Sequence, residues 1–329
     1  MSSDQSIKPE PEIDLGLLSE ILLTTRLHGG LFMHAEFSAP WCMASEFHPE
    51  RFSDVLDGAV ELVCYHYLLE GEVEFEFDGA PAFKLKSGEA ILVPRNDSHF
   101  AGSDVTLPAT PGQDIVTSPN GAGLFNINHG GGGETAIFVC GFIGSRAEDF
   151  NPLIRSLPPV IVVKFENEET DAWVRSSFRF GADESASLIP GASKQLARLS
   201  ELLLMQAVKS YAMRLPADET SWLRGLRDRH VAKAMALIHG DVARKWTMTE
   251  LSREVGLSRS ALSHRFHKLV GVPPMQYLAS QRMLKAGQLL SIPDKSIAEV
   301  AATVGYGSYE AFARAFKSHY GKPPATWRA

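Results

Sequence analysis

Apolar residues recur with two different periods along this chain, and the period changes near residue 193. In residues 72–77, EVEFEF, apolar and polar side chains alternate strictly, which is the pattern of a half-buried strand. Alternation or a short apolar run predicts further strands at residues 83–86, 90–93, 136–142 and 160–165. Short strands separated by regular glycine turns predict a β-barrel or a β-sandwich.

Helical spacing dominates the rest of the chain. Residues 13–27 have the apolar spacing of a helix, and a leucine stripe predicts a longer helix at residues 193–214. After Trp222 we expect helices at about residues 227–239, 248–256, 259–269, 274–291, 296–304 and 309–320. Residues 106–133, which are rich in Gly, Pro, Asn and Thr, are expected to form a long loop.

Charge is distributed unevenly between these parts. Residues 224–329 contain 17 Lys and Arg against 7 Asp and Glu, a net charge of +10, whereas residues 1–223 contain 15 against 32, a net charge of −17. A basic module on an acidic body favours nucleic acid as the partner of the basic part. No apolar run reaches the ~18–20 residues of a membrane span, and the acidic N-terminus lacks a signal-peptide pattern. With only three cysteines, we expect a cytoplasmic protein without membrane contact.

Two successive helix-turn-helix patterns lie in the basic part, at Thr249–Val270 and Ser296–Tyr320. In each, a short helix is followed by a turn on a glycine, Gly256 or Gly305, and by a second helix that opens after a serine. Glycine permits a positive φ at the turn, and serine caps the helix that follows. The second helix of such a unit enters the major groove of DNA, so these patterns predict DNA binding.

The outward-facing side chains of the two second helices are the predicted DNA contacts. They are Arg259, Ser260, Ser263, His264, His267 and Lys268 in the first unit, and Tyr309, Glu310, Arg314 and Lys317 in the second. Arginine suits guanine or phosphate, serine and histidine suit base edges, and a carboxylate can accept from a cytosine amine. The helix predicted at Met275–Leu290 would span ~24 Å. With its flanking turns it separates the two reading helices by about one turn of DNA, ~34 Å.

The basic part closely resembles the C-terminal domain of AraC/XylS-type bacterial transcription regulators over about residues 227–328. The resemblance is carried by SRSALSHRFHKLVGVPPMQYL, by the run Ala302–Lys317 and by the closing Gly321–Pro324. Ser260 is small where many members of that family carry a larger residue, so their target sites cannot be transferred to this chain. The resemblance implies promoter DNA and RNA polymerase as partners, and paired promoter sites favour a homodimer. We expect an activator, and repression is the alternative that the sequence leaves open.

The acidic part resembles a cupin domain over about residues 15–165. Residues 88–99 resemble the second cupin motif, with Asn96 in place of its glycine and His99 at its histidine. Cys64–Phe75 is similar to the strand and Glu-Gly turn that precede this motif. The resemblance implies a small β-barrel that can hold a ligand in its mouth.

We therefore expect an α+β multidomain fold, with a cupin-like β-barrel followed by an all-α domain containing two helix-turn-helix units. The predicted boundaries are residues 1–190 for the sensor domain, 191–222 for a linker or dimerisation helix and 223–329 for the DNA-binding domain.

The first cupin motif, which supplies most metal ligands in metal-binding cupins, is broken in this chain. Cys64 stands where its glutamate is expected, and no histidine lies near residues 58–60. His66 shares a strand face with Cys64, and His99 could approach both, a set that suits zinc or copper. The alternative is that Cys64 is a small buried apolar residue and His66 a hydrogen-bonded core residue. The broken motif favours this alternative, so no cofactor is expected.

Redox sensing is a separate hypothesis. A reversible disulfide between Cys42 and Cys64 would require Cα atoms within ~7 Å, and the cytoplasm permits transient regulatory disulfides. The predicted sensing residues are therefore Cys42, Cys64, His66 and His99, and they would respond to a small ligand or a redox signal.

Together these patterns predict a sequence-specific DNA-binding transcription regulator controlled by its cupin domain, and not an enzyme. The alternative is a cupin metalloenzyme with an appended DNA-binding domain. That alternative needs a metal triad or an acid–base pair, and the sequence has no nucleophile elbow, no His-Glu-x-x-His pattern and no intact first cupin motif. A third class, the non-specific architectural DNA protein, would not need an acidic sensor domain.

Overall fold

A computed structural model gives the fold, and its contacts divide the chain into two units. It describes residues 14–22, 29–52, 56, 59–117, 126–145, 154, 157–165, 168–187, 192–215, 222–290 and 295–327. One unit, here the sensor unit, comprises residues 25–211, and the other, here the DNA-binding unit, comprises residues 1–24 and 212–329. None of the described helices is long and apolar enough to cross a membrane.

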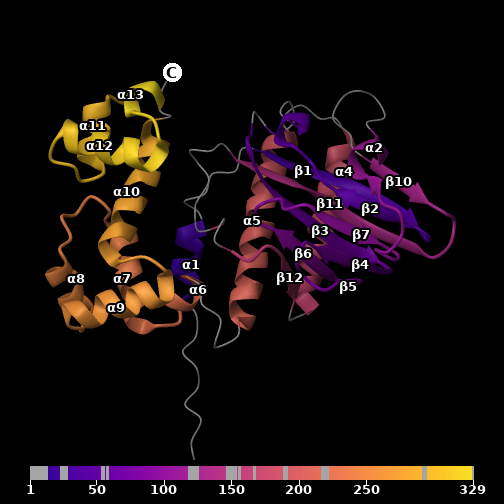
Figure 1. Cartoon of the computed structure of the whole chain (residues 1–329), viewed down its shortest axis with the longest axis horizontal. Coiled ribbons are helices and arrows are strands. Elements are labelled where there is room, and N and C mark those ends of the chain that lie inside the picture. Colours follow the sequence, from indigo (N-terminus) through magenta and orange to yellow (C-terminus); the bar gives the residue numbers. More distant parts are fainter. Residues whose placement is uncertain are drawn as a thin grey trace, which may run out of the picture. The chain divides into compact units, whose positions relative to one another are not determined.

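The sensor unit is built on two β-sheets (Figure 1). The larger sheet has the strand order β12-β6-β3-β11-β1-β10-β9, and the smaller one β5-β4-β7-β2-β8. The strands are β1 Gly29–Ser38, β2 Cys42–Ser45, β3 Glu61–Glu70, β4 Glu72–Phe77, β5 Phe83–Lys86, β6 Glu89–Val93, β7 His99–Gly102, β8 Thr110–Pro111, β9 Val116–Thr117, β10 Asn126–Gly130, β11 Thr135–Ser145 and β12 Ile161–Lys164. The strands predicted from alternation match β4 and β5 and overlap β6, β11 and β12.

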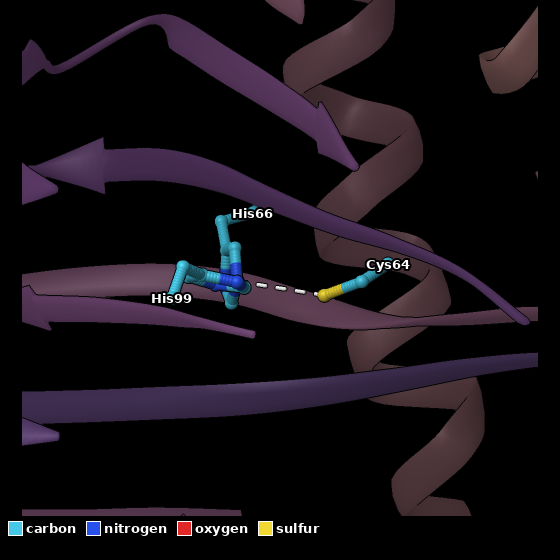
Figure 2. A group of neighbouring side chains, drawn as sticks. All are labelled: Cys64, His66 and His99. Atoms are coloured by element: carbon cyan, nitrogen blue, oxygen red, sulfur yellow. Dashed lines mark hydrogen bonds between the residues drawn. The ribbon is translucent and has the colours of Figure 1, made fainter. Parts of the chain in front are cut away.

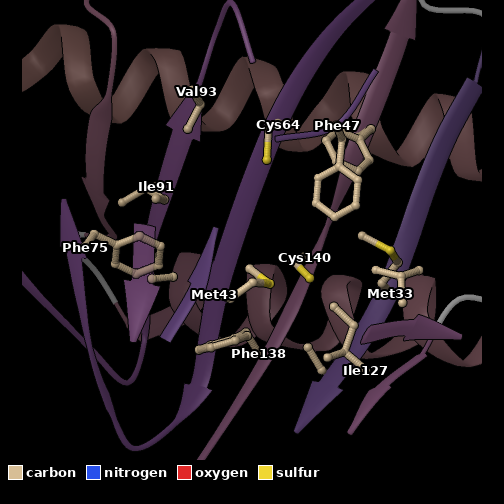
Figure 3. Packing of buried hydrophobic residues seen from close by; sticks show 14 of the residues in the cluster. Met33, Met43, Phe47, Cys64, Phe75, Ile91, Val93, Ile127, Phe138 and Cys140 are labelled. Carbon is tan, nitrogen blue, oxygen red and sulfur yellow. The ribbon is translucent and has the colours of Figure 1, made fainter. Parts of the chain in front are cut away.

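An apolar core lies between the two sheets (Figure 3). It contains Met33, Phe138 and Cys140 from the larger sheet and Met43 and Phe75 from the smaller one. The expected cupin-like β-barrel is confirmed in this form, as two facing sheets that the described strands do not join into one hydrogen-bonded ring.

Strand β3 is buried on both faces, which explains its nearly continuous apolar sequence. Cys64 and Leu68 face the core between the sheets. Tyr65 and Tyr67 face the opposite way, where their rings pack on Phe178 with centroid distances of 5.4 and 4.6 Å. Two successive side chains of this strand therefore serve two different layers.

Two helices complete the sensor unit, α4 Glu168–Ser187 and α5 Ala192–Arg214. Helix α5 confirms the helix predicted at residues 193–214, whereas α4 was not predicted. Its apolar contacts depend on the distant strand β1, because Gly181 lies so close to Phe32 that an added Cβ would be 2.6 Å from the Phe32 ring. A stripe containing a glycine carries little helical signal by itself.

The expected loop at residues 106–133 is wrong in part. It contains β8, helix α2 Gly112–Ile115, β9 and β10. Strand β10 pairs in parallel with β1, a partner about ninety residues earlier, and such a pairing leaves no local signal in the sequence. A short 3-10 helix, η1 Pro49–Phe52, follows β2.

The DNA-binding unit is helical, as expected. Its helices are α1 Leu15–Leu22, α6 Trp222–Gly225, α7 Arg229–Gly240, α8 Met248–Val255, α9 Arg259–Val270, α10 Pro274–Leu290, α11 Ile297–Thr303, α12 Tyr309–Tyr320 and α13 Pro324–Trp327. All six helices predicted after Trp222 are present, and their ends agree to within about two residues.

Helix α1 lies within the predicted sensor domain, residues 1–190, and its contacts group it with the DNA-binding unit. The predicted domain boundaries stay a prediction. Helix α1 packs on α7, and the backbone N–H of Asp14 donates to the carbonyl of Leu226 at 3.3 Å. The predicted boundary at residue 190 lies outside the described residues.

Candidate DNA-binding surface and sensor site

Local capping signals define the first helix-turn-helix unit, here head one. Thr247 and Glu250 form a capping box at the start of α8, in which each side chain bonds the backbone N–H of the other. Gly256 ends α8 in the left-handed conformation with φ 74°. The Ser258 hydroxyl then accepts from the N–H of Ala261 and opens α9.

The core of head one selects the face of α9 that remains free. Leu262 and Phe266 are fully buried, and the Phe266 ring packs against Tyr277 of α10 with centroids 5.5 Å apart. The predicted contacts Arg259, Ser260, His264, His267 and Lys268 are exposed, and Ser263 is half-buried. Their predicted exposure is therefore found, and their contact with DNA stays a prediction.

The second unit, here head two, repeats this construction. Ser296 and Glu299 form the capping box of α11, Gly305 provides the turn with φ 84°, and Ser308 caps α12. The buried rings of Phe312 and Phe316 anchor α12. The predicted contacts Tyr309, Glu310, Arg314 and Lys317 are all exposed.

The heads are joined by more than the connecting helix α10. Gly305 lies against the loop before α8, where an added Cβ would be 2.3 Å from the carbonyl oxygen of Ala243. Arg282 of α10 donates to the carbonyls of Val242 and Arg244 at 2.7 and 2.8 Å, and its guanidinium lies 5.7 Å from the ring centroid of Tyr306. The turn of head two is thus fixed on the loop that leads into head one.

One exposed cation of α9 was missing from the predicted set. Arg265 pairs with Asp228 at 2.5 Å, and Asp228 also caps α7 by accepting from the N–H groups of His230 and Val231. Arg265 therefore braces α9 against α7. Its position beside the core residue Phe266 was the only sequence signal for this role.

Three of the predicted sensing residues converge inside the sensor unit (Figure 2). Cys64 and His66 lie two residues apart on β3 and face the same way, and His99 reaches them from β7 in the opposite sheet. Cys64 Sγ lies 3.5 Å from His66 Nε2, which lies 2.9 Å from His99 Nε2. All three side chains are buried, so the predicted approach of these residues is found.

Burial governs the protonation of this Cys64/His66/His99 cluster. Desolvation lowers the pKa of His66 well below its ordinary value, and the neighbouring His99 lowers it further. Desolvation likewise lowers the pKa of His99 to about 4, against the opposing effect of its hydrogen bond to the carbonyl of Asp97. Desolvation raises the pKa of the Cys64 thiol well above its usual range. The three groups are thus neutral near pH 7.

Two family matches cover most of the chain. Residues 16–213 match the family described as cupin, and residues 251–329 match a helix-turn-helix domain family. The chain is 31% identical over 277 residues to a protein of Streptomyces lividans described as an AraC-like transcription regulator, covering 82% of this chain and 88% of that one.

A second relative and a solved structure are also similar to this chain. The HTH-type transcriptional regulator AlkR of Acinetobacter baylyi is 27% identical over 278 residues, covering 82% of this chain and 89% of its own. The DNA-binding domain of AdpA, solved in complex with a target DNA, is 30% identical and covers 31% of this chain and 90% of that chain, with a TM-score of 0.29. The chain belongs to the AraC-like transcription regulators.

In this AraC-like regulator, the residue that replaces the glycine of the second cupin motif has a backbone conformation that favours glycine. Asn96 has φ 54°, and it is the only non-glycine residue with positive φ among the described residues. Asparagine tolerates this left-handed region better than most residues. Its side-chain amide also donates to the carbonyl of Phe47 at 2.8 Å, which helps to position the turn before His99.

The predicted proximity of Cys42 to Cys64 is not found in the regulator. Met43 faces the core that contains Cys64, and because side chains alternate along a strand, Cys42 faces away from it. The Cys42 thiol instead lies 3.9 Å from the carbonyl oxygen of Val105. Burial, with the carboxylates of Asp104 and Glu76, raises its pKa, which lowers the fraction of reactive thiolate. The three cysteines are free.

Proposed function

We propose that this regulator activates transcription by binding two successive major grooves of promoter DNA, one with each head. The docking of Gly305 and Arg282 on the loop before α8 carries this proposal, because it fixes the two recognition helices in one unit. Helix α10, with 17 residues, supplies a rise of ~26 Å between them. That length suits grooves one DNA turn apart.

Arg259 and Arg314 are the side chains that test this proposal most simply. Each is exposed on its recognition helix, and each can form bidentate hydrogen bonds with guanine. On a DNA site selected by the wild-type protein, we expect Arg259→Ala and Arg314→Ala each to weaken binding by about 1–3 kcal/mol. Lys233→Ala removes one exposed charge from α7 and is the matched control, with a smaller loss. Equal losses on random DNA would assign both arginines to phosphate contact and contradict base reading.

Helix α5 is the proposed route by which a small molecule controls the regulator. An apolar cavity lies between the outer face of the larger sheet and the helices, lined by Phe32, Phe178, Leu203 and Leu204 among others. The division between the two units falls within α5, after Tyr211. The cavity has a volume of only about 20 Å³, so a ligand larger than a water molecule would have to displace its lining, which includes Leu203 and Leu204 of α5.

The proposed homodimer would form through the outer face of α4. Trp173 and Phe180 are seven residues apart on this helix, share one face and are 42% and 50% exposed. Large exposed apolar side chains are typical of association surfaces. We expect Trp173→Glu with Phe180→Glu to convert a dimer to a monomer in light scattering, whereas Arg179→Glu leaves the mass unchanged. A wild-type monomer would rule out the dimer.

The remaining parts of the proposal follow from the regulator's relatives. The proteins that it resembles are described as transcription regulators, so we propose that it acts on cytoplasmic DNA, contacts RNA polymerase and catalyses no reaction. Transcription in vitro with purified polymerase tests this directly. The protein should raise transcript yield from its own promoter, and an unchanged or lower yield would contradict activation.

A further inference from the structure

We propose that Cys64, His66 and His99 bind one thiophilic d10 metal ion, copper(I) or zinc(II), inside the sensor unit. This reverses the preference drawn from the broken cupin motif. The reason is geometric, because His66 adds a ligand that the motif does not contain and the fold brings it to the other two.

The distances between the three ligand atoms fit a shared metal ion. Bonds of ~2.3 Å to sulfur and ~2.0–2.1 Å to nitrogen, at tetrahedral angles, place neighbouring ligand atoms about 3.3–3.6 Å apart. Cys64 Sγ and His66 Nε2 are 3.5 Å apart, and the two Nε2 atoms are 2.9 Å apart. All three atoms lie within 4.8 Å of one another. The two Nε2 atoms are at hydrogen-bonding distance, so binding of the ion would require side-chain rotations that separate them.

The second nitrogen of His99 prepares this residue as a ligand. His99 Nδ1 lies 2.9 Å from the backbone carbonyl oxygen of Asp97, and a carbonyl oxygen can only accept. Nδ1 therefore carries the proton, and Nε2 presents its lone pair to the cluster. Metal-ligating histidines show this same arrangement, in which a carbonyl fixes the tautomer and the ring.

The surroundings of the cluster select for low net charge. His99 stacks on Phe77 with centroids 4.8 Å apart, and His66 lies 5.5 Å from Phe75. Cys64 belongs to a core cluster that includes the apolar residues Leu68, Phe75 and Phe77. Burying a net charge in such a core is costly. Copper(I) with one thiolate and two neutral imidazoles has no net charge, whereas zinc(II) leaves +1, so the core favours copper(I).

Binding of the ion releases one proton. The Cys64 S–H bond breaks, the metal–sulfur bond forms, and the thiol proton leaves to solvent. His66 supplies Nε2 once its ring proton lies on Nδ1. A purely structural role for the cluster needs only the hydrogen bond between the two histidines, and it gives no reason for Cys64 to approach the same point.

Metal titration of the full-length protein tests the proposal. Protein stripped with a chelator is titrated anaerobically with copper(I) against bicinchoninate, and separately with zinc(II) against a chromophoric chelator. We expect one equivalent per chain in at least one titration, with Cys64→Ser and His99→Gln each weakening affinity by about 100-fold or more. The matched control is Cys140→Ser, which changes a second buried thiol of the same core and should bind as wild type.

Cobalt(II) gives a second readout that reports the thiolate itself. The thiolate-to-cobalt absorption band should form in wild type and in Cys140→Ser and be absent in Cys64→Ser. His99→Gln keeps the test valid if Cys64→Ser does not fold, as judged by near-ultraviolet circular dichroism. Failure of both ions to bind, or wild-type affinity in folded Cys64→Ser, would overturn the proposal. An effect of the metal on DNA binding would rest on the proposed function. The metal titration uses no DNA, so its result does not depend on that function.

Discussion

The two units of this regulator differ in where their candidate functional residues lie. In the DNA-binding unit the candidate contacts lie on the surface, and buried rings such as Phe266 and Phe316 serve only to orient the helices that carry them. In the sensor unit the candidate chemistry is buried between two sheets, where Cys64, His66 and His99 meet. A substitution at a surface site removes one contact and leaves the fold intact. A substitution at a buried site also disturbs the core that stabilises the unit. The two units should therefore respond differently to mutation.

The largest effect that separates the units comes from removing a core ring. Phe316 is fully buried and packs against Phe312, Tyr320 and Trp327. We expect Phe316→Ala to lower the free energy of unfolding of the DNA-binding unit by about 3–5 kcal/mol. Urea unfolding should show this loss in one transition while metal affinity in the sensor unit stays unchanged. The exposed Ser318→Ala is the control. A matching loss of metal affinity would show that the units do not fold independently.

The next largest effect concerns how the two heads are held together. Gly256 and Gly305 have similar positive φ values, but an added Cβ at Gly256 meets nothing within 4 Å, whereas at Gly305 it would be 2.3 Å from the Ala243 carbonyl. Gly256→Ala should therefore destabilise by the conformational term alone, about 1–2 kcal/mol. Gly305→Ala should destabilise further and reduce affinity for a site read by both heads. Equal unfolding free energies and equal DNA affinities in the two variants would contradict docking of the heads.

How much could be predicted from the sequence depends on whether an element is formed by local interactions or by contacts with distant parts of the chain. The helices of both heads were predicted almost to the residue, because signals such as the turn at Gly256 and the cap at Ser258 act within one turn of the chain. Helix α4 was not predicted because Gly181 weakens the helical pattern. The need for a glycine there comes from its close contact with Phe32 of a distant strand. The approach of His99 to Cys64 was expected only from the resemblance to a cupin barrel, because the facing of two sheets leaves no local signal in a single sequence. Alternation predicted which way Cys64 and His66 point, but not which strand lies opposite them.

A further stability effect in the DNA-binding unit depends on pH. His239 of α7 lies 2.8 Å from the Tyr277 hydroxyl, and burial lowers its pKa to about 4. The unfolded chain takes up a proton near pH 6.5 that the folded unit resists, so this contribution is complete above pH 6.5 and is lost as the pH falls toward 4. At pH 5 the loss is about 2 kcal/mol.

Urea unfolding at pH 7 and pH 5 checks this value. The difference in the free energy of unfolding between the two pH values should be smaller by about 2 kcal/mol in His239→Gln. This substitution keeps a polar group beside Tyr277 but does not titrate. His264→Gln changes an exposed histidine of α9 and serves as the control. An undiminished pH dependence in His239→Gln would show that other groups cause the acid sensitivity.

Binding of successive grooves by the two heads can be tested by selecting binding sites from random DNA with the purified full-length protein. We expect an enriched site with two blocks of base preference centred about 10 base pairs apart, one per head. Arg259→Ala should relax one block and Arg314→Ala the other. A single block, or two blocks that both relax with either substitution, would contradict a regulator whose two heads read successive grooves.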